Sequence, residues 1–156
     1  MSARKRKSHD HRRCLSGALS AAKTLAAAKR LKLTEGRRRV LEIVADSHKP
    51  LGAYDILERL QKKSHTPIAP PTVYRALEFL LKAGLVHRID TKNAYLACFD
   101  SGRAHSGVFL ICENCGLARE IDDPKLERNL ARSTKRAGFS ARRKTVEISG
   151  TCAACR

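Results

Sequence analysis

The amino-acid sequence predicts an α+β fold, in which a helical region closed by a β-hairpin is followed by a small α/β domain. Three observations predict this fold. Apolar residues recur at helical spacing through the first half of the chain, an alternating pattern with a four-residue turn follows them, and two Cys-x-x-Cys pairs bracket a strand–helix–strand pattern near the end.

Charge and hydropathy limit the function classes that this chain of 156 residues can serve. Its net charge of +17 indicates a polyanionic partner, either nucleic acid or an anionic membrane surface. Residues 1–39 contain 13 Lys and Arg residues but only Asp10 and Glu35 as acids, so this stretch alone carries +11. No apolar run approaches the roughly 20 residues of a membrane span, and no secretory signal is expected. The N-terminus faintly resembles a transit peptide, but we favour a cytoplasmic, reducing location.

Four helices are expected after a disordered basic arm, residues 1–14. Ala, Leu, Lys and Arg favour the first helix by propensity, and Thr34 stands where it can act as the N-cap of the second. Pro71 occupies the favoured first position of the fourth helix, and Gly84 follows its end. The expected helices are residues 16–33, 38–45, 53–63 and 71–83.

The fourth helix is followed by an expected β-hairpin, residues 85–89 and 94–99, which turns through residues 90–93. The last three of these helices, followed by the hairpin, are in the order of a winged helix-turn-helix. In this fold the last helix enters the major groove of DNA. The hairpin is then the wing. After it, strands over 108–111, 118–121 and 142–148 and a helix opened by Asp123 and Pro124 are expected.

Four side chains are candidates for DNA contact. Arg75 projects from the first turn of the fourth helix, where bidentate contact with guanine is the commonest specific contact. Thr72 shares the face of Arg75, and Tyr74 is expected at the groove margin or on a phosphate. Tyr54 begins the preceding helix and would touch the backbone or a thymine methyl. The alternative is that the cations only solvate a surface helix, but the helix order, the wing and the basic arm together favour DNA.

Two Cys-x-x-Cys pairs predict a structural zinc site in the last third of the chain. Cys112 and Cys115 form the first pair, Cys152 and Cys155 form the second, and 36 residues lie between the pairs. Each pair places two thiolates on one tight turn, so two pairs complete a closed tetrahedral site. The alternatives are two disulfides or a thiol redox centre, and a reducing compartment favours the metal over both.

The wing carries side chains that suit a second metal ion. In the register that pairs Ile89 with Ala94, Cys98 is the diagonal neighbour of His87 on the same face, so imidazole and thiolate could reach one zinc ion. The third and fourth ligands would be His105 and Glu120. Taken singly, these residues also have ordinary interpretations: Cys98 as a small buried side chain, His105 as a loop histidine and Glu120 as an ion-pair partner.

Several of these features together resemble the ferric uptake regulator superfamily, and within it the zinc-sensing branch. They are the stretch APPTVYRALEFLLKAGLVHR, the four candidate ligands around the wing, and the paired cysteine turns after it. The likeness covers about residues 20–155. It implies a winged-helix DNA-binding domain over residues 15–100, a hinge over 101–105 and a small α/β dimerisation domain over 106–156.

The resemblance also implies a function. Such proteins are cytoplasmic homodimers that bind palindromic operator DNA when loaded with zinc and repress zinc uptake genes. It implies two zinc ions per chain, one structural and held by the four cysteines, and one regulatory and held by the four wing-associated ligands. It further implies DNA contacts from Tyr54 and Arg75.

Some features depart from the family pattern. The His-rich cluster of iron-sensing relatives is missing, since only His105 stands in RAHSG, and a thiolate from Cys98 favours zinc over iron or manganese. An iron, manganese or peroxide sensor of the same superfamily remains an alternative, as does a constitutive DNA-binding protein with purely structural zinc. A zinc enzyme is not expected, because the His-x-Glu and Pro-Cys-x-x-Cys patterns of zinc deaminases do not occur. The basic arm, with His9, His11 and Cys14, has no family counterpart.

Overall fold

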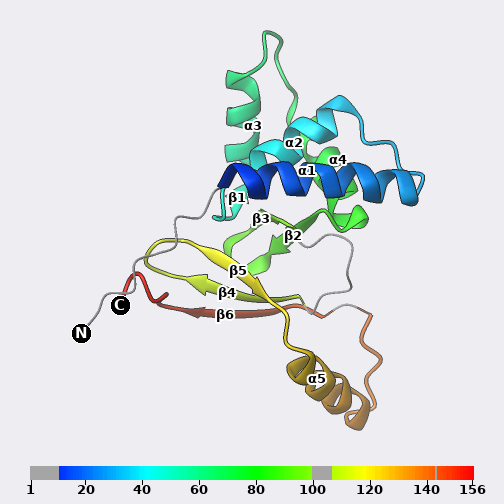
Figure 1. The fold of residues 1–156 in the computed structure, drawn as a ribbon, viewed down its shortest axis with the longest axis vertical. Helices are drawn as coiled ribbons and strands as arrows, with labels where there is room; N and C mark the ends of the chain where they lie inside the picture. Colours follow the sequence, from blue (N-terminus) through cyan, green and yellow to red (C-terminus); the bar gives the residue numbers. More distant parts are fainter. Residues whose placement is uncertain (1–10, 100–106, 143) are drawn as a thin grey trace.

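The computed structural model describes residues 11–99, 107–142 and 144–156. Figure 1 shows three layers along the longest axis: a helical bundle at the top, two small sheets below it, and one isolated helix at the bottom. Three expectations fall outside the described residues, in whole or in part: the basic arm over residues 1–10, the hinge, and His105. No helix in the described part of the chain is both long and apolar enough to cross a bilayer.

Four helices form the upper layer, in the expected order. They are α1 (His11–Ala28), α2 (Glu35–Ala45), α3 (Ala53–Lys62) and α4 (Pro70–Ala83). Their apolar faces make one core with the wing, and the largest buried side chains include Leu41, Ile56, Leu77 and Leu80. The caps match the expectation as well. The Thr34 hydroxyl accepts a hydrogen bond from the N–H of Arg37, and Gly84 ends α4 with a φ of 76°.

The first helix differs from the expectation at both ends. It was expected over residues 16–33, but α1 begins at His11 and ends at Ala28, so the last four residues of the expected arm, 11–14, are helical. No Gly or Pro interrupts the chain between His11 and Ser16 to stop the helix there. At the other end the chain reverses at Arg30, which has a φ of 51°, and this turn ends the helix before residue 33.

The wing forms a three-stranded antiparallel sheet with a short strand from the bundle. β2 (Val86–Ile89) and β3 (Ala94–Ala97) are joined by the 3₁₀ turn η1 (Asp90–Lys92), and the pairing of Ile89 with Ala94 confirms the expected register. β1 (Leu51–Gly52) adds to the other edge of β3. A strand of two residues has no alternating pattern, so the sequence does not predict it.

The second sheet is built from the last third of the chain. β4 (Val108–Cys112) lies between β5 (Ala118–Ile121), which is antiparallel to it, and β6 (Val146–Gly150), which is parallel. The helix α5 (Pro124–Arg136) connects β5 to β6, and the Asp123 carboxylate caps it. β6 begins at Val146, four residues later than expected, because its partner β4 begins only at Val108.

The two sheets meet through a small apolar cluster. Ile89 and Leu96 of the wing are buried together with Phe109, Ile111 and Ala118 of the second sheet. This cluster is separate from the core of the helical bundle. The wing is therefore held between two apolar contacts, one with the bundle and one with the C-terminal sheet.

Candidate metal centres

The four cysteines of the two Cys-x-x-Cys pairs converge at one end of the C-terminal sheet. β4 and β6 are parallel, so the turns that follow them lie at the same edge, and Cys112 pairs with Gly150 just before the second cysteine pair. The Sγ atoms of Cys115 and Cys152 are 3.8 Å apart, and all four Sγ atoms lie within 4.8 Å of one another. Tetrahedral zinc with Zn–S bonds of about 2.3 Å requires sulfur atoms about 3.8 Å apart, so the spacing fits.

The electrostatics of this cluster also fit a bound cation. All four thiols are free of disulfide bonds. Backbone N–H groups of Cys115 and Cys152 point at the sulfur of Cys112 and lower the pKa of that thiol to about 6. The neighbouring thiols of Cys152 and Cys115 raise the pKa of Cys155 to about 12. Four sulfurs this close can all ionise only when a cation offsets their repulsion, as a divalent zinc ion would.

The second cluster joins the wing to the C-terminal sheet. It consists of His87 on β2, Cys98 directly after β3, and Glu120 on β5, and one ligand atom of each lies within 4.8 Å of the others. The Nε2 atom of His87 is 3.2 Å from an oxygen of Glu120. Cys98 is buried, and the other two side chains are mostly covered. Nitrogen, sulfur and carboxylate oxygen are all zinc ligands, so these three residues fit part of a zinc site.

One row of residues across the C-terminal sheet faces the wing. Glu120, Phe109 and Glu147 are neighbours in register on β5, β4 and β6, so their side chains leave the same face of the sheet. Glu120 reaches the imidazole of His87, and the ring of Phe109 lies beneath that imidazole with the centroids 5.1 Å apart. The imidazole of His87 therefore lies between the Phe109 ring and the Glu120 carboxylate, with its Nε2 atom beside the carboxylate.

The third member of the row, Glu147, is not among the residues predicted from sequence. Its carboxylate accepts hydrogen bonds from the backbone N–H groups of Asp90, at 2.6 Å, and Thr91, at 3.0 Å, and from the Thr91 hydroxyl. Burial raises the pKa of Glu147, but these hydrogen bonds outweigh it and the net pKa is lowered. The available sequence signal is that Glu147 is the only acid after Glu127 in a strongly basic stretch.

The candidate DNA contacts lie on the helical bundle, away from both clusters. Tyr54 is in the first turn of α3 and is 72% exposed. Thr72, Tyr74 and Arg75 are in the first two turns of α4, and all three are exposed. Exposed tyrosines beside an arginine at the N-terminal turns of two adjacent helices form a surface that phosphates and base edges could reach.

The chain matches known proteins over most of its length. The model of the Ferric uptake regulator family matches residues 28–149. The zinc uptake regulation protein of Escherichia coli (strain K12) is 34% identical over 139 residues, which are 88% of this chain and 80% of the relative. A solved zinc uptake regulator complexed with zinc and DNA is 34% identical and has a TM-score of 0.83, covering 90% of this chain and 94% of that chain.

Two further solved structures differ in how well they superpose. Holo XcZur is 38% identical and has a TM-score of 0.80, covering 88% of this chain and 95% of that chain. Apo XcZur is 37% identical but has a TM-score of only 0.56, covering 92% of this chain and 98% of that chain. The sequence identity is almost the same in the two cases. The difference in TM-score therefore reflects a difference in three-dimensional arrangement between the two XcZur structures.

Proposed function

The chain belongs to the ferric uptake regulator family, and we propose that it is a zinc-responsive transcriptional repressor. It binds palindromic operator DNA as a homodimer when zinc-loaded and controls zinc uptake genes. The observation that carries this proposal is the convergence of His87, Cys98 and Glu120 where the wing meets the C-terminal sheet. A metal site at that position joins the part of the chain that reads DNA to the part that forms the dimer.

We assign one structural and one regulatory zinc ion to each chain. The structural zinc would be held by Cys112, Cys115, Cys152 and Cys155, which leave no open coordination position. The regulatory zinc would be held by His87, Cys98 and Glu120, with His105 as the expected fourth ligand. When bound there, zinc supplies a cross-link between side chains from separate segments of the chain.

The residues around the regulatory cluster determine where the wing stands. Ile89 and Leu96 pack on Phe109, and Glu147 binds the backbone of the wing turn. Because α4 leads directly into the wing, these contacts also place the recognition helix relative to the dimerisation domain. The likeness to holo XcZur rather than apo XcZur supports the proposal that this arrangement belongs to the zinc-loaded state.

Two recognition helices in a dimer read half-sites that lie one helical turn, or a multiple of it, apart. When the wing is fixed against the dimerisation domain, the two α4 helices of the dimer stay at one separation. When the wing is free to move, they adopt many separations, and few of these fit the operator. In this proposal Arg75 reads base edges, while Thr72, Tyr74 and Tyr54 contact the groove margin and the phosphates.

The dimer would form through the other face of the C-terminal sheet. Leu110 and Ile148 are neighbours in register on β4 and β6, and they are 39% and 46% exposed. α5 is amphipathic, yet none of its residues is buried, including Leu126 and Leu130 on its apolar face. A second copy of the chain would cover these apolar groups.

We propose that the dimer acts in the cytoplasm and that it has no enzymatic activity, as expected of a family of regulators.

Binding to a palindromic operator from a zinc-transporter promoter tests the proposed function. Affinity is measured across buffered free zinc concentrations at one fixed salt concentration, because phosphate contacts make affinity salt-dependent. We expect affinity to rise steeply with free zinc and to respond less to iron or manganese at matched buffering. An affinity that does not change with free zinc would leave only a DNA-binding protein with structural zinc.

A further inference from the structure

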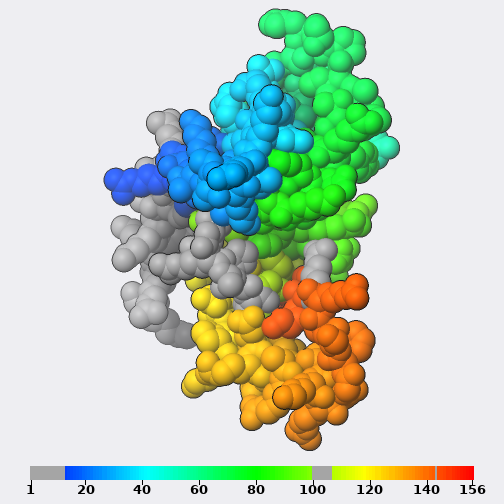
Figure 2. Space-filling view, turned by 90° about the vertical axis from the view of Figure 1, so that its right-hand side faces the viewer, coloured from blue at the N-terminus to red at the C-terminus, as the bar shows by residue number. Residues whose placement is uncertain are grey.

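The helix α5 has one strongly basic face. Five exposed cations lie within about 120° of its circumference when 3.6 residues make one turn. They are Lys125, Arg128, Arg132, Lys135 and Arg136, and together we name them the basic stripe. Leu126 and Leu130 lie outside this face, so the basic stripe is not needed to pack the helix against an apolar partner. Figure 2 shows this part of the chain, in yellow to orange, on the surface at the lower end of the molecule.

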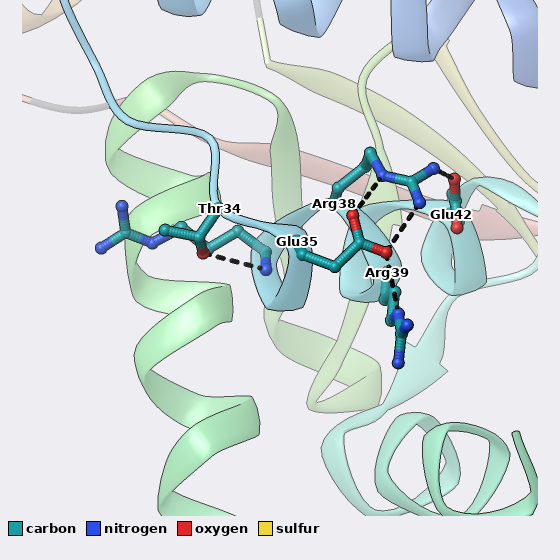
Figure 3. A network of polar contacts seen from close by, with 6 residues as sticks. Thr34, Glu35, Arg38, Arg39 and Glu42 are labelled. Atoms are coloured by element: carbon teal, nitrogen blue, oxygen red, sulfur yellow. Dashed lines mark hydrogen bonds and ion pairs between the residues drawn. The ribbon is translucent and has the colours of Figure 1, made fainter. Parts of the chain in front are cut away.

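Several cations on α2, α3 and α4 are compensated by acids of the same helix. In α2, Glu35 pairs with both Arg38 and Arg39, and Glu42 also pairs with Arg38 (Figure 3). The same pattern occurs on α3 and α4, where an acid pairs with a lysine one turn further along the same helix. These pairs are Glu58 with Lys62 and Glu78 with Lys82. The compensated cations are solvated helix surface and need no partner.

The basic stripe lacks this compensation. Among the described residues, no carboxylate pairs with any of its five cations, and Arg132 donates only to the amide oxygen of Asn129 at 2.5 Å. Glu127 is the single acid of α5, and it pairs with Lys144 outside the helix. The cations therefore face solvent without an acidic neighbour on their own helix.

The basic stripe also opposes the stability of its own helix. Lys125 and Arg128, Arg128 and Arg132, and Arg132 and Arg136 are like charges three or four residues apart, and such pairs destabilise a helix. Lys125 and Arg128 lie near the N-terminus, where the helix dipole disfavours positive charge. Only Lys135 and Arg136, in the last turn, suit the dipole. An anionic partner that offsets this repulsion explains the stripe, whereas helix stability does not.

We propose that the basic stripe binds the phosphate backbone of a second segment of double-stranded DNA, separate from the operator that α4 reads. The stripe spans roughly 17 Å from Lys125 to Arg136, a length over which one strand of a duplex presents about five phosphates. Lys125, Arg128, Asn129 and Arg132 alone line a surface hollow of about 500 Å³, so the surface offers only donors and cations to phosphate oxygens, apart from the Asn129 amide oxygen.

The position of the stripe makes a second duplex the fitting partner. α5 lies at the end of the molecule opposite α3, which carries Tyr54 (Figure 1). One operator-bound protein therefore presents the stripe away from its own duplex. Binding at the operator places neighbouring duplex DNA at a high effective concentration, which favours DNA over other polyanions. The contact requires no base readout, because backbone phosphates carry the affinity. The inference goes beyond the proposed repression and does not depend on which metal regulates it.

A bridging experiment tests the second surface. An immobilised operator duplex is saturated with the zinc-loaded full chain at low salt, and capture of a labelled random duplex is then measured against salt concentration. The test variant is Arg128→Gln with Arg132→Gln. The matched control is Arg142→Gln with Arg156→Gln, which removes two exposed cations of the C-terminal third of the chain outside α5. A third variant, Arg128→Lys with Arg132→Lys, keeps the charge.

We expect the wild type, the control and the charge-keeping variant to capture the random duplex, and the test variant to capture it at least tenfold more weakly. The salt dependence of capture should lose about 0.9 in log–log slope for each phosphate contact removed. The proposal is overturned by a wild type that captures no second duplex, by equal losses in both glutamine variants, or by unchanged capture in the test variant. In a parallel measurement with labelled RNA, capture of the RNA without capture of duplex DNA would assign the surface to another partner and also overturn the proposal. Operator affinity and its zinc dependence, measured in the loading step, report on the proposed function separately.

Discussion

The two clusters of metal-binding side chains differ in what they connect. The four cysteines come from turns at the ends of two strands that are already hydrogen-bonded in one sheet, so their geometry follows from the pairing of β4 with β6. His87 and Cys98 belong to the wing and Glu120 to the second sheet, and these two parts meet through a small apolar cluster and the contact of Glu147 with the wing turn. A metal ion bound by the four cysteines would join two turns of one sheet. A metal ion bound by His87, Cys98 and Glu120 would instead hold the wing against the C-terminal sheet.

This difference is the basis of the proposed division into a structural and a regulatory site. A site formed within one sheet stabilises that sheet and changes little else, and its metal is in effect part of the fold. A metal site between two parts of the chain shifts the balance between their arrangements, and it does so only as far as the metal binds one arrangement better than the other. In the proposed function, the position of the ligands in the fold is what separates the structural site from the regulatory one.

Replacing Cys112 should have the largest effect. Cys112→Ser removes the thiol whose ionisation the surrounding N–H groups favour most, and structural zinc contributes about 10–16 kcal/mol in small zinc-binding peptides. That exceeds the stability of many whole domains, so we expect loss of the folded dimer. Zinc content and sedimentation of the variant provide the measurement, with the neighbouring Glu113→Gln as control. A stable dimer with its full zinc content would contradict the structural assignment.

Replacing Cys98 should remove regulation but leave the fold. Cys98→Ser changes one atom of a buried side chain, and its backbone N–H still reaches the carbonyl of Leu85. We expect zinc content to fall by one ion per chain and the dimer to persist. Operator affinity at saturating zinc should then drop to the zinc-free level. Cys14→Ser is the matched control and should behave as the wild type. Normal zinc-dependent repression by the Cys98 variant would remove this residue from the regulatory site.

Replacing Arg75 should weaken DNA binding without touching either cluster. Arg75→Ala would remove the proposed bidentate contact to a base, which would be worth about 1–3 kcal/mol and therefore roughly 5-fold to 150-fold in affinity. The free-zinc midpoint should stay where it is, since the regulatory residues are unchanged. Binding to operators with single base changes shows whether specificity relaxes at one position. Lys82→Ala, at the other end of the same helix, is the control. Equal losses in both variants would contradict a base contact.

Replacing Glu147 should have the smallest effect. In Glu147→Gln an amide nitrogen replaces one of the oxygens that accept from the wing turn, and we expect a loss on the order of 1 kcal/mol, or several-fold. The loss should appear as a higher free-zinc midpoint, because the ordered arrangement of the wing is less favoured before zinc binds. Midpoints are measured by operator binding in zinc buffers, against Glu113→Gln. A midpoint unchanged from the wild type would show that the Glu147 contact does not position the wing.

The titration of Glu147 sets the conditions for that comparison. Its pKa is lowered in the folded protein, so its contribution is fully present above the ordinary glutamate range near 4.3. The contribution is lost only as pH falls through the lowered pKa. The free-zinc midpoint of the glutamine variant should therefore differ from that of the wild type at every pH in the neutral range.

Local patterns in the sequence predict much of this fold. Thr34 and Gly84 mark helix ends through chemistry that acts within a few residues, and the four-residue turn sets the register that pairs Ile89 with Ala94. The spacing of the cysteines within each pair likewise places two thiols on one turn. Such features depend on neighbours along the chain and can be recognised without a structure.

Features that depend on distant partners are harder to predict. β1 is a strand only because β3 offers a free edge, and β6 begins at Val146 only because β4 begins at Val108. Glu147 is an ordinary strand residue in the sequence, and its contact with the wing turn exists only after the two sheets meet. Glu120 could be proposed as a ligand from its chemistry, but its distance to His87 is set by the same meeting of sheets.

The most direct test is to measure the distance between the two recognition helices of the dimer as free zinc is varied, without DNA. Spin labels attached by a chemistry that spares cysteines, at exposed Glu78 of α4, would report the distribution of distances. We predict a broad distribution of distances at low zinc that narrows to one distance as zinc rises, and no narrowing in Cys98→Ser. The same distribution at every zinc concentration, in a dimer whose operator affinity still rises with zinc, would contradict it.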